Sequence, residues 1–250
     1  MELLKVKNYL LCSCIVFVSL TGALFADDAS QKKEPRIGNI AAAKVLILGN
    51  SITLHEPAPE IGWNGNWGMA ASSKETDFAH LLVKQIAQVT GTEPLLFAKN
   101  IAAFERGYRE YDFLKELKSE LEFQADIVIL AIGENVAEPT SDDSKKAFAS
   151  GCEKLIETVR ARGERAIFVR SSFWANTVKD DILKSACKAT NATYIDISNL
   201  GAIETNAARS ERKIDHAGVG AHPGDAGMQA IADAIFKAIE KQSKLDFDKK

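Results

Sequence analysis

The chain has 250 residues, of which 46 % are hydrophobic and 26 % charged, and its formal net charge is −3. This length and apolar fraction suit one well-packed domain rather than two. The sequence contains no Lys/Arg-rich block, which argues against the basic surface of a nucleic-acid-binding protein. We therefore expect a small-molecule or carbohydrate partner and no nucleic acid.

The N-terminal residues follow the order of a secretory signal peptide. Two lysines precede an apolar run over residues 9–20, small residues follow the run, and a polar stretch begins at Asp27. We expect a signal peptide over residues 1–26 with cleavage after Ala26, Ala23 being the other candidate. A retained membrane anchor is the alternative, but the run is shorter than the ~20 residues that span a bilayer comfortably. The mature chain is expected in the periplasm or outside the cell, with no membrane partner.

Three further segments follow the expected signal peptide. An exposed polar spacer is expected over residues 27–40, a domain over 41–241, and a charged tail over 242–250. In the domain, apolar runs typical of buried strands alternate with helical patterns. The expected strands cover residues 44–48, 95–98, 126–132, 166–169 and 193–197. The expected helices cover residues 77–89, 111–123, 141–162, 179–189 and 224–241.

Continuous apolar strands that alternate with helices indicate a parallel sheet covered on both faces. We therefore predict an α/β domain of three layers, α/β/α, around a five-stranded, mainly parallel sheet. Removal of the signal peptide leaves two cysteines, Cys152 and Cys187. Each lies on an expected helix with apolar neighbours, which favours two buried free thiols over a disulfide, although an exporting compartment permits one. The sequence has no CxxC and no metal-ligand spacing of Cys with His, so no metal is expected.

Ligands of such sheets bind beyond the carboxyl ends of the strands, so the residues that follow each strand are informative. Ser51 follows the first strand in Gly49-Asn50-Ser51. A serine there can act as a nucleophile or simply cap a helix. Neither a phosphate-binding loop nor a GxSxG elbow is present.

Two other strand ends carry residues that would complete a serine site. Asn135 follows the third strand in Gly133-Glu134-Asn135, and its amide can donate to a developing oxyanion; the alternative is an ordinary turn. His222 precedes the last helix and can act as general base for a serine. A lone histidine there is usually a surface residue, so its coincidence with Ser51 and Asn135 is the informative feature.

These blocks resemble those of the SGNH, or GDSL-like, hydrolases, over about residues 43–239. The resemblance implies a flavodoxin-like fold, Ser51 as nucleophile and His222, in His222-Pro223, as base. It also implies an oxyanion hole formed by the Ser51 amide, Asn135 and a third backbone N–H. The family's second block matches residues 100–102, with Ala102 where the family usually has glycine.

The chain departs from the family at the acidic residue that orients the histidine. The family's usual Asp lies three residues before the catalytic His, where this chain has Val219. Three alternatives remain open: a backbone carbonyl orients His222 and leaves a Ser–His dyad, Asp215 reaches it from the same loop, or Glu60 replaces the acid. Asp225 is expected to cap the last helix instead.

The segment over residues 55–69 is rich in Pro and Gly and carries two of the three tryptophans, Trp63 and Trp67. Because it follows Ser51 directly, we expect it to line or roof the crevice. Aromatic faces beside polar groups suit a sugar ring, so both tryptophans and Glu134 are candidate substrate contacts. The alternative is that the tryptophans pin the segment to the core.

The sequence thus predicts an exported serine esterase without a cofactor, acting on a small-molecule or carbohydrate ester such as an O-acetylated sugar. Two alternatives stay open. One is a non-catalytic carbohydrate-binding module on a degenerate hydrolase fold, which the missing Asp motivates. The other is an acyltransferase, because the same acyl-enzyme can pass its acyl group to a sugar hydroxyl.

Overall fold

The computed structural model describes residues 34–245, and the predicted signal peptide lies outside these residues. Five parallel strands form the central sheet in the order β4-β3-β5-β6-β7. The strands are β3 (Lys44–Gly49), β4 (Leu95–Asn100), β5 (Ile127–Ala131), β6 (Ala166–Arg170) and β7 (Thr193–Ile195). Each lies within two or three residues of its predicted position.

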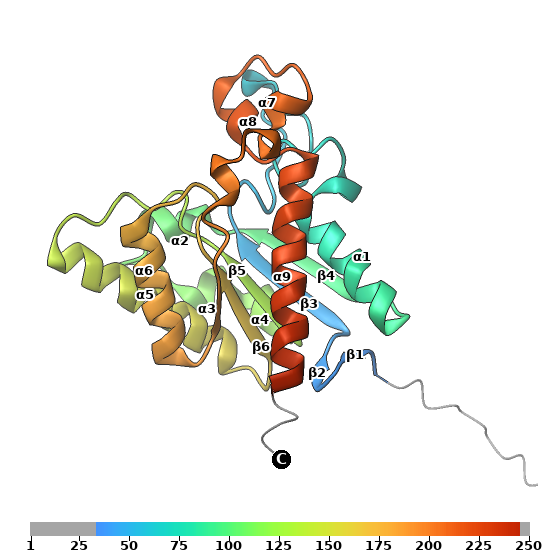
Figure 1. Cartoon of the computed structure of the whole chain (residues 1–250). Coiled ribbons are helices and arrows are strands. Elements are labelled where there is room, and N and C mark those ends of the chain that lie inside the picture. Colours follow the sequence, from blue (N-terminus) through green and yellow to red (C-terminus); the bar gives the residue numbers. More distant parts are fainter. Residues whose placement is uncertain (1–33, 246–250) are drawn as a thin grey trace, which may run out of the picture. The chain divides into compact units, whose positions relative to one another are not determined.

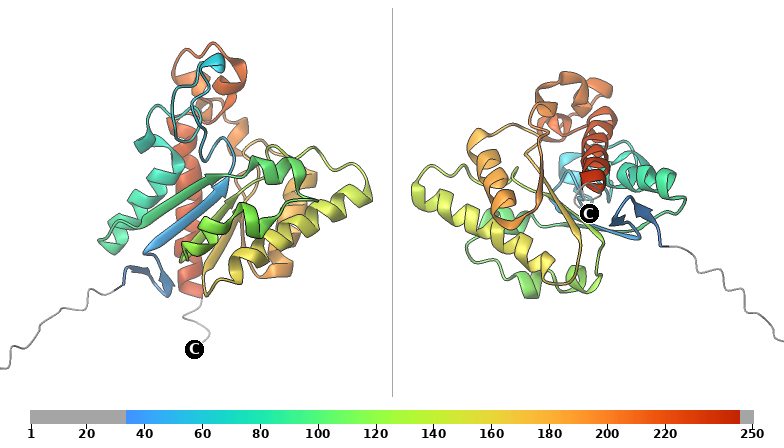
Figure 2. Two further views of the ribbon diagram at one scale, coloured as in Figure 1. Left: turned by 180° about the vertical axis from the view of Figure 1, so that it is seen from behind. Right: turned by 60° about the horizontal axis from the view of Figure 1, so that its bottom comes forward.

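Two separate hydrophobic clusters cover the two faces of the sheet. The long helices are α1 (Phe78–Thr90), α5 (Asp142–Arg160), α6 (Thr177–Thr190) and α9 (Asp225–Leu245). Along β3, Val45 and Ile47 pack with α1 and α9, whereas Leu46 and Leu48 pack with α5 and α6. In Figure 1, α9 crosses in front of the sheet, and in the rear view of Figure 2 it lies behind the strands. The three-layer α/β/α prediction is confirmed. No helix within residues 34–245 combines the length and apolar character needed to cross a membrane.

The helix boundaries follow from local capping. Asp77 caps α1 by accepting a hydrogen bond from the His80 amide, and Gly91 ends the helix at φ +71°. The single helix predicted over residues 111–123 is instead two short helices, α3 (Phe113–Glu116) and α4 (Lys118–Glu122). They are divided at Leu117, whose side chain is fully buried at a non-helical φ of −114°. The sequence pattern also missed α2 (Ala102–Gly107).

The described part of the predicted spacer is packed rather than exposed. Strands β1 (Arg36–Ile37) and β2 (Ile40–Ala41) pair antiparallel, and their two isoleucines are buried in the cluster beneath α1 and α9. Residues 36–40 therefore belong to the domain and not to the exposed spacer expected over 27–40. At the other end, α9 continues through Leu245 with Ser243 buried, into the tail expected from residue 242.

Short elements gather beyond the carboxyl ends of the strands, at the top of Figure 1. They are the 3-10 turns η1 (Pro59–Ile61), η2 (Lys74–Thr76), η3 (Leu200–Ala202) and η4 (Glu204–Asn206), and the helices α7 (Ala208–Glu211) and α8 (Ala217–Ala221). A third, small cluster joins the segment after β3 to α7 and α8, through Trp63, Met69, Ala208 and Val219 among others. This cluster holds two distant parts of the chain together above the sheet.

The two cysteines, Cys152 on α5 and Cys187 on α6, are both free and buried. Burial raises the pKa of both thiols, that of Cys187 to about 12. They are therefore protonated core residues with little nucleophilic character.

Candidate active site

Ser51 lies at the tip of a tight turn that follows β3. Gly49 permits the turn, because a Cβ there would lie 2.9 Å from the Ala131 carbonyl oxygen and closer still to Thr53. Asn50 is fully buried, and its side-chain oxygen accepts a hydrogen bond from the Ile52 amide at 3.1 Å. With its neighbours tied inward, Ser51 is left only partly buried at the sheet edge.

His222 meets this serine from the opposite end of the domain sequence. Ser51 Oγ and His222 Nε2 lie 2.8 Å apart. His222 Nδ1 lies 2.7 Å from the carbonyl oxygen of Gly218, one turn earlier in α8. A carbonyl oxygen only accepts hydrogen bonds, so Nδ1 carries the proton and donates. Nε2 is then unprotonated and free to accept the Ser51 hydroxyl proton.

Neither carboxylate proposed from the sequence lies beside His222. Asp215 is 90 % exposed and pairs with Lys213, and Glu60 is an exposed residue of η1. Val219, in the position of the family's usual Asp, is buried in the small cluster with Trp63. Of the three alternatives for what orients His222, the structure shows the first, a backbone carbonyl.

Burial lowers the pKa of His222 below its usual 6.5, while the Gly218 hydrogen bond and the charge of Glu134 oppose this shift. The ring of Trp174 stands edge-on to the imidazole, with 5.3 Å between centroids and 84° between planes. The imidazole is therefore neutral near pH 7, as a general base must be.

Asn135 presents its side chain to the same pocket. The pocket has a volume of about 470 Å³ and is lined by Ser51, Ala102, Asn135 and His222 among other residues. Asn135 Nδ2 donates to Glu105 Oε2 at 2.8 Å, and Oδ1 accepts from Arg106 at 3.1 Å. These partners fix the orientation of the amide, because a guanidinium only donates and a carboxylate accepts. The second Nδ2–H is left for a ligand in the pocket.

Ala102 lines the pocket, but its amide is already engaged. The Ala102 N–H donates to Asn100 Oδ1 at 2.9 Å, and Asn100 Nδ2 donates to the Leu54 carbonyl at 2.9 Å. The predicted third oxyanion donor is thus occupied by a side chain of its own turn. It becomes available only if Asn100 moves.

Glu134 is a structural residue rather than the predicted substrate contact. One carboxylate oxygen accepts from Arg170 Nη1 at 2.5 Å and from the Phe173 amide at 2.9 Å, and the other accepts from Asn50 Nδ2 at 2.6 Å. Its side chain is 5 % exposed and that of Arg170 is fully buried. Burial opposes ionisation, but Arg170 and these donors hold the Glu134 pKa below its usual value.

Glu105, on the unpredicted helix α2, is the main residue that the sequence analysis missed. It is fully buried and accepts hydrogen bonds from the Gly133 amide at 2.5 Å, from Asn50 Nδ2 at 3.3 Å and from Asn135. Burial, and then repulsion by Glu134, raise its pKa. No local motif marks this residue, because its partners come from two other strand ends.

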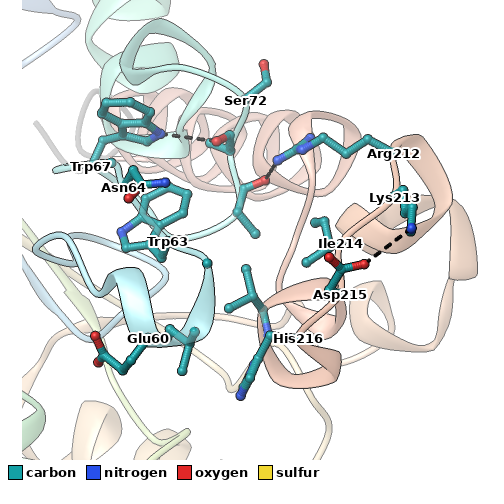
Figure 3. Close-up of a pocket in the computed structure, with 16 residues that line it drawn as sticks. Glu60, Trp63, Asn64, Trp67, Ser72, Arg212, Lys213, Ile214, Asp215 and His216 are labelled. Atoms are coloured by element: carbon teal, nitrogen blue, oxygen red, sulfur yellow. Dashed lines mark hydrogen bonds and ion pairs between the residues drawn. The ribbon is translucent and has the colours of Figure 1, made fainter.

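The two tryptophans of the insert pin it in place. Trp63 is 6 % exposed and donates through Nε1 to the His55 carbonyl, and Trp67 donates to the Ala71 carbonyl, each at 3.1 Å. Their rings meet edge to face at 5.5 Å. Both line a second cavity next to the site, shown in Figure 3, and neither is among the residues that line the Ser51 pocket.

Within residues 34–245, no group of three or more His, Cys, Asp or Glu side chains is arranged to hold a metal ion. The side chains of the Ser51 pocket supply a hydroxyl with a neutral imidazole, an amide donor and the guanidinium of Arg106.

No protein-family model and no curated protein sequence matches the chain. Several solved structures do match the chain. A lipase/acylhydrolase from Enterococcus faecalis is 16 % identical at a TM-score of 0.53, covering 80 % of this chain and 96 % of its own. A GDSL-like lipase from Parabacteroides merdae is 17 % identical at a TM-score of 0.53, covering 81 % and 98 %. A two-domain esterase active on acetylated mannans is also 17 % identical at 0.53, covering 81 % of this chain and 50 % of its own.

These findings establish the fold of the chain. The chain has the α/β fold of the SGNH hydrolases, with a five-stranded parallel sheet flanked by helices. At these identities the likeness extends to the fold, and the chemistry rests on the residues of this chain.

Proposed function

We propose that this protein is an exported esterase that hydrolyses ester groups on carbohydrate, with Ser51 as nucleophile and His222 as general base. The observation that carries the proposal is the 2.8 Å contact between Ser51 Oγ and His222 Nε2. The Gly218 carbonyl selects the tautomer in which that nitrogen accepts a proton.

The reaction would follow from this geometry in two halves. Ser51 Oγ attacks the ester carbonyl carbon as its proton passes to His222 Nε2, and the carbonyl oxygen becomes an oxyanion. The Ser51 amide and the second Nδ2–H of Asn135 donate to that oxygen. The tetrahedral intermediate collapses, His222 protonates the leaving alcohol, and water then hydrolyses the acyl-enzyme by the same route.

A dyad of this kind lacks a carboxylate beside the imidazolium that forms in the transition state. The Gly218 carbonyl offers a dipole there instead of a charge, and the buried Glu134 favours the protonated imidazole from further away. A missing acid weakens such catalysis without abolishing it, because the oxyanion hole and substrate binding retain part of the rate.

Two observations support a carbohydrate ester as the substrate. The lining of the pocket around Ser51 includes the polar side chains of Asn100, Arg106 and Asn135, which can bind the hydroxyl groups of a sugar alcohol. The structurally similar two-domain esterase is active on acetylated mannans. Export rests on the order of residues in the N-terminal segment.

The test uses Ser51→Ala, with Ser119→Ala on the exposed face of α4 as the matched control. The wild type and the control should hydrolyse p-nitrophenyl acetate and be labelled by a fluorophosphonate, whereas Ser51→Ala should lose both properties. The expected fall in kcat is at least about 10⁴-fold. Equal turnover by Ser51→Ala would refute the proposal, and a wild type without labelling or turnover would favour a non-catalytic binding module.

A further inference from the structure

A second cavity lies next to the Ser51 pocket and is larger than it. This outer pocket has a volume of about 770 Å³, within the range of pockets that bind small molecules. Ile61, His216 and Val219 line both pockets, so the two pockets adjoin each other at these three residues.

Two segments far apart in the sequence form its walls. Figure 3 shows Glu60, Trp63, Asn64 and Trp67 on one side, facing residues 212–216 on the other. The same segments hold the proposed catalytic pair: the Met69 amide donates to the Ser51 carbonyl at 2.8 Å, and α8 supplies the Gly218 carbonyl that orients His222.

The outer pocket is preformed by its own contacts. Gly65 lies so close to both indoles that a Cβ would come within 2.5 Å of Trp63 and 2.8 Å of Trp67. Arg212 donates to the Ala70 carbonyl and so ties the second wall to the first. A wall that is already ordered adds little ordering cost to binding.

The charges of the lining point to a neutral ligand. Glu60 and Asp215 are acidic and Arg212 and Lys213 are basic, so the formal charges cancel. Apolar surface for a C–H face comes from Trp67 and the two isoleucines, Ile61 and Ile214. Within residues 34–245, the exposed side chains of Glu60 and Asn64 have no hydrogen-bond partner, and are free to bind hydroxyl groups.

We infer that the outer pocket binds a neutral saccharide unit of the substrate, remote from the ester that Ser51 attacks. This inference rests on the proposed function, because it places two parts of one substrate in two adjoining pockets. It assigns Asn64 as a specificity residue that touches the saccharide and takes no part in the chemistry.

The experiment compares Asn64→Ala with Asn66→Ala, an exposed asparagine of the same loop that does not line the pocket. Each variant is assayed with p-nitrophenyl acetate, which is small enough for the Ser51 pocket alone, and with an O-acetylated oligomer of neutral hexoses. Asn64→Ala should raise KM for the oligosaccharide roughly 3- to 10-fold, as expected for one lost hydrogen bond. It should leave kcat and the p-nitrophenyl acetate kinetics unchanged, and Asn66→Ala should match the wild type throughout.

Direct binding separates this inference from the esterase proposal. In the Ser51→Ala background, titration of the same oligosaccharide is followed by tryptophan fluorescence, with and without the bulky block Asn64→Trp. Binding that weakens in Asn64→Ala and is lost in Asn64→Trp supports the outer pocket even if the wild type proves inactive. Unchanged binding in both variants, or binding only of uronate-containing or amino-sugar oligomers, overturns the inference.

Discussion

The two halves of the candidate site are held in place by different means. Ser51 and Asn135 stand at the ends of β3 and β5, above a buried network of Asn50, Glu105 and Glu134 with Arg170. His222 stands at the end of the five-residue helix α8, where one carbonyl of that helix orients its ring. The nucleophile side thus depends on charged side chains from several separate elements, whereas the base side depends on a local turn.

The largest expected effect comes from breaking the buried ion pair on the nucleophile side. Arg170→Met leaves the Glu134 carboxylate buried without its counter-charge, and loss of one partner of such a pair typically costs about 3–5 kcal/mol. Chemical denaturation should show this fall in the free energy of unfolding. The control is Arg209→Met, which removes an exposed pair with Glu204 and should change stability very little. Equal losses in the two variants would contradict the distinction between buried and exposed pairs.

A smaller effect, on activity, is expected from Glu105→Gln. Glutamine replaces one carboxylate oxygen by an NH2 group that only donates, and this group opposes either the Gly133 N–H or the Asn135 Nδ2–H that Glu105 now accepts. Complete loss of an oxyanion donor costs about 10²–10³ in kcat, and a misplaced Asn135 should cost roughly 10-fold or more. KM for p-nitrophenyl acetate should not change. A rise in KM with kcat intact would mean that Glu105 does not position Asn135 for the transition state.

The base side is tested by the pH dependence of kcat/KM. The folded-state pKa of His222 is lowered by burial, so the imidazole stays neutral until the pH falls through that lowered value. The acidic limb should therefore have its midpoint below the usual 6.5. His216→Asn keeps a capping side chain for α8 but removes a nearby charge that lowers the pKa of His222, so the limb should move slightly upward. A midpoint at or above 6.5 in the wild type, or a downward move in His216→Asn, would assign the limb to another group.

The smallest expected effect concerns Asp215, which the sequence offered as one candidate for the acid that orients His222. Its carboxylate is exposed and pairs with Lys213 at 3.6 Å, and exposed pairs contribute little. With p-nitrophenyl acetate, Asp215→Asn should change kcat by less than about 2-fold. A loss of the size seen on removing a catalytic acid would instead show that the loop rearranges to bring Asp215 to His222.

The sequence predicted the sheet and the convergence of Ser51, Asn135 and His222, because apolar strand runs and the residues at strand ends are local signals. It could not predict Glu105 or Arg170, whose partners come from different strands and depend on register. It placed Glu134 in the substrate site, although that carboxylate points inward to Arg170. Composition also left open whether the indoles of the insert contact substrate or pin it to the core, and Trp63 is a core residue of a small cluster.

The capping of α9 is a further feature that the sequence did not predict correctly. Asp225 was expected to cap the helix, but its carboxylate accepts hydrogen bonds from Ser72 and Thr76 in the insert. Glu211 instead accepts from the Asp225 and Ala226 amides. The residue type at the start of a helix suggests a cap, but only the fold decides which carboxylate reaches the amides.

The carbonyl of Gly218 has a consequence for how proteins of this kind change over time. An orienting carboxylate is lost by a single codon change, but an orienting carbonyl belongs to the main chain and survives most such changes. Position 218 is still not free, because a Cβ there would lie 3.0 Å from the His216 ring. Selection would then act on the shape of this turn instead of on an acidic residue, and a search pattern that requires Asp three positions before the histidine would pass over such chains.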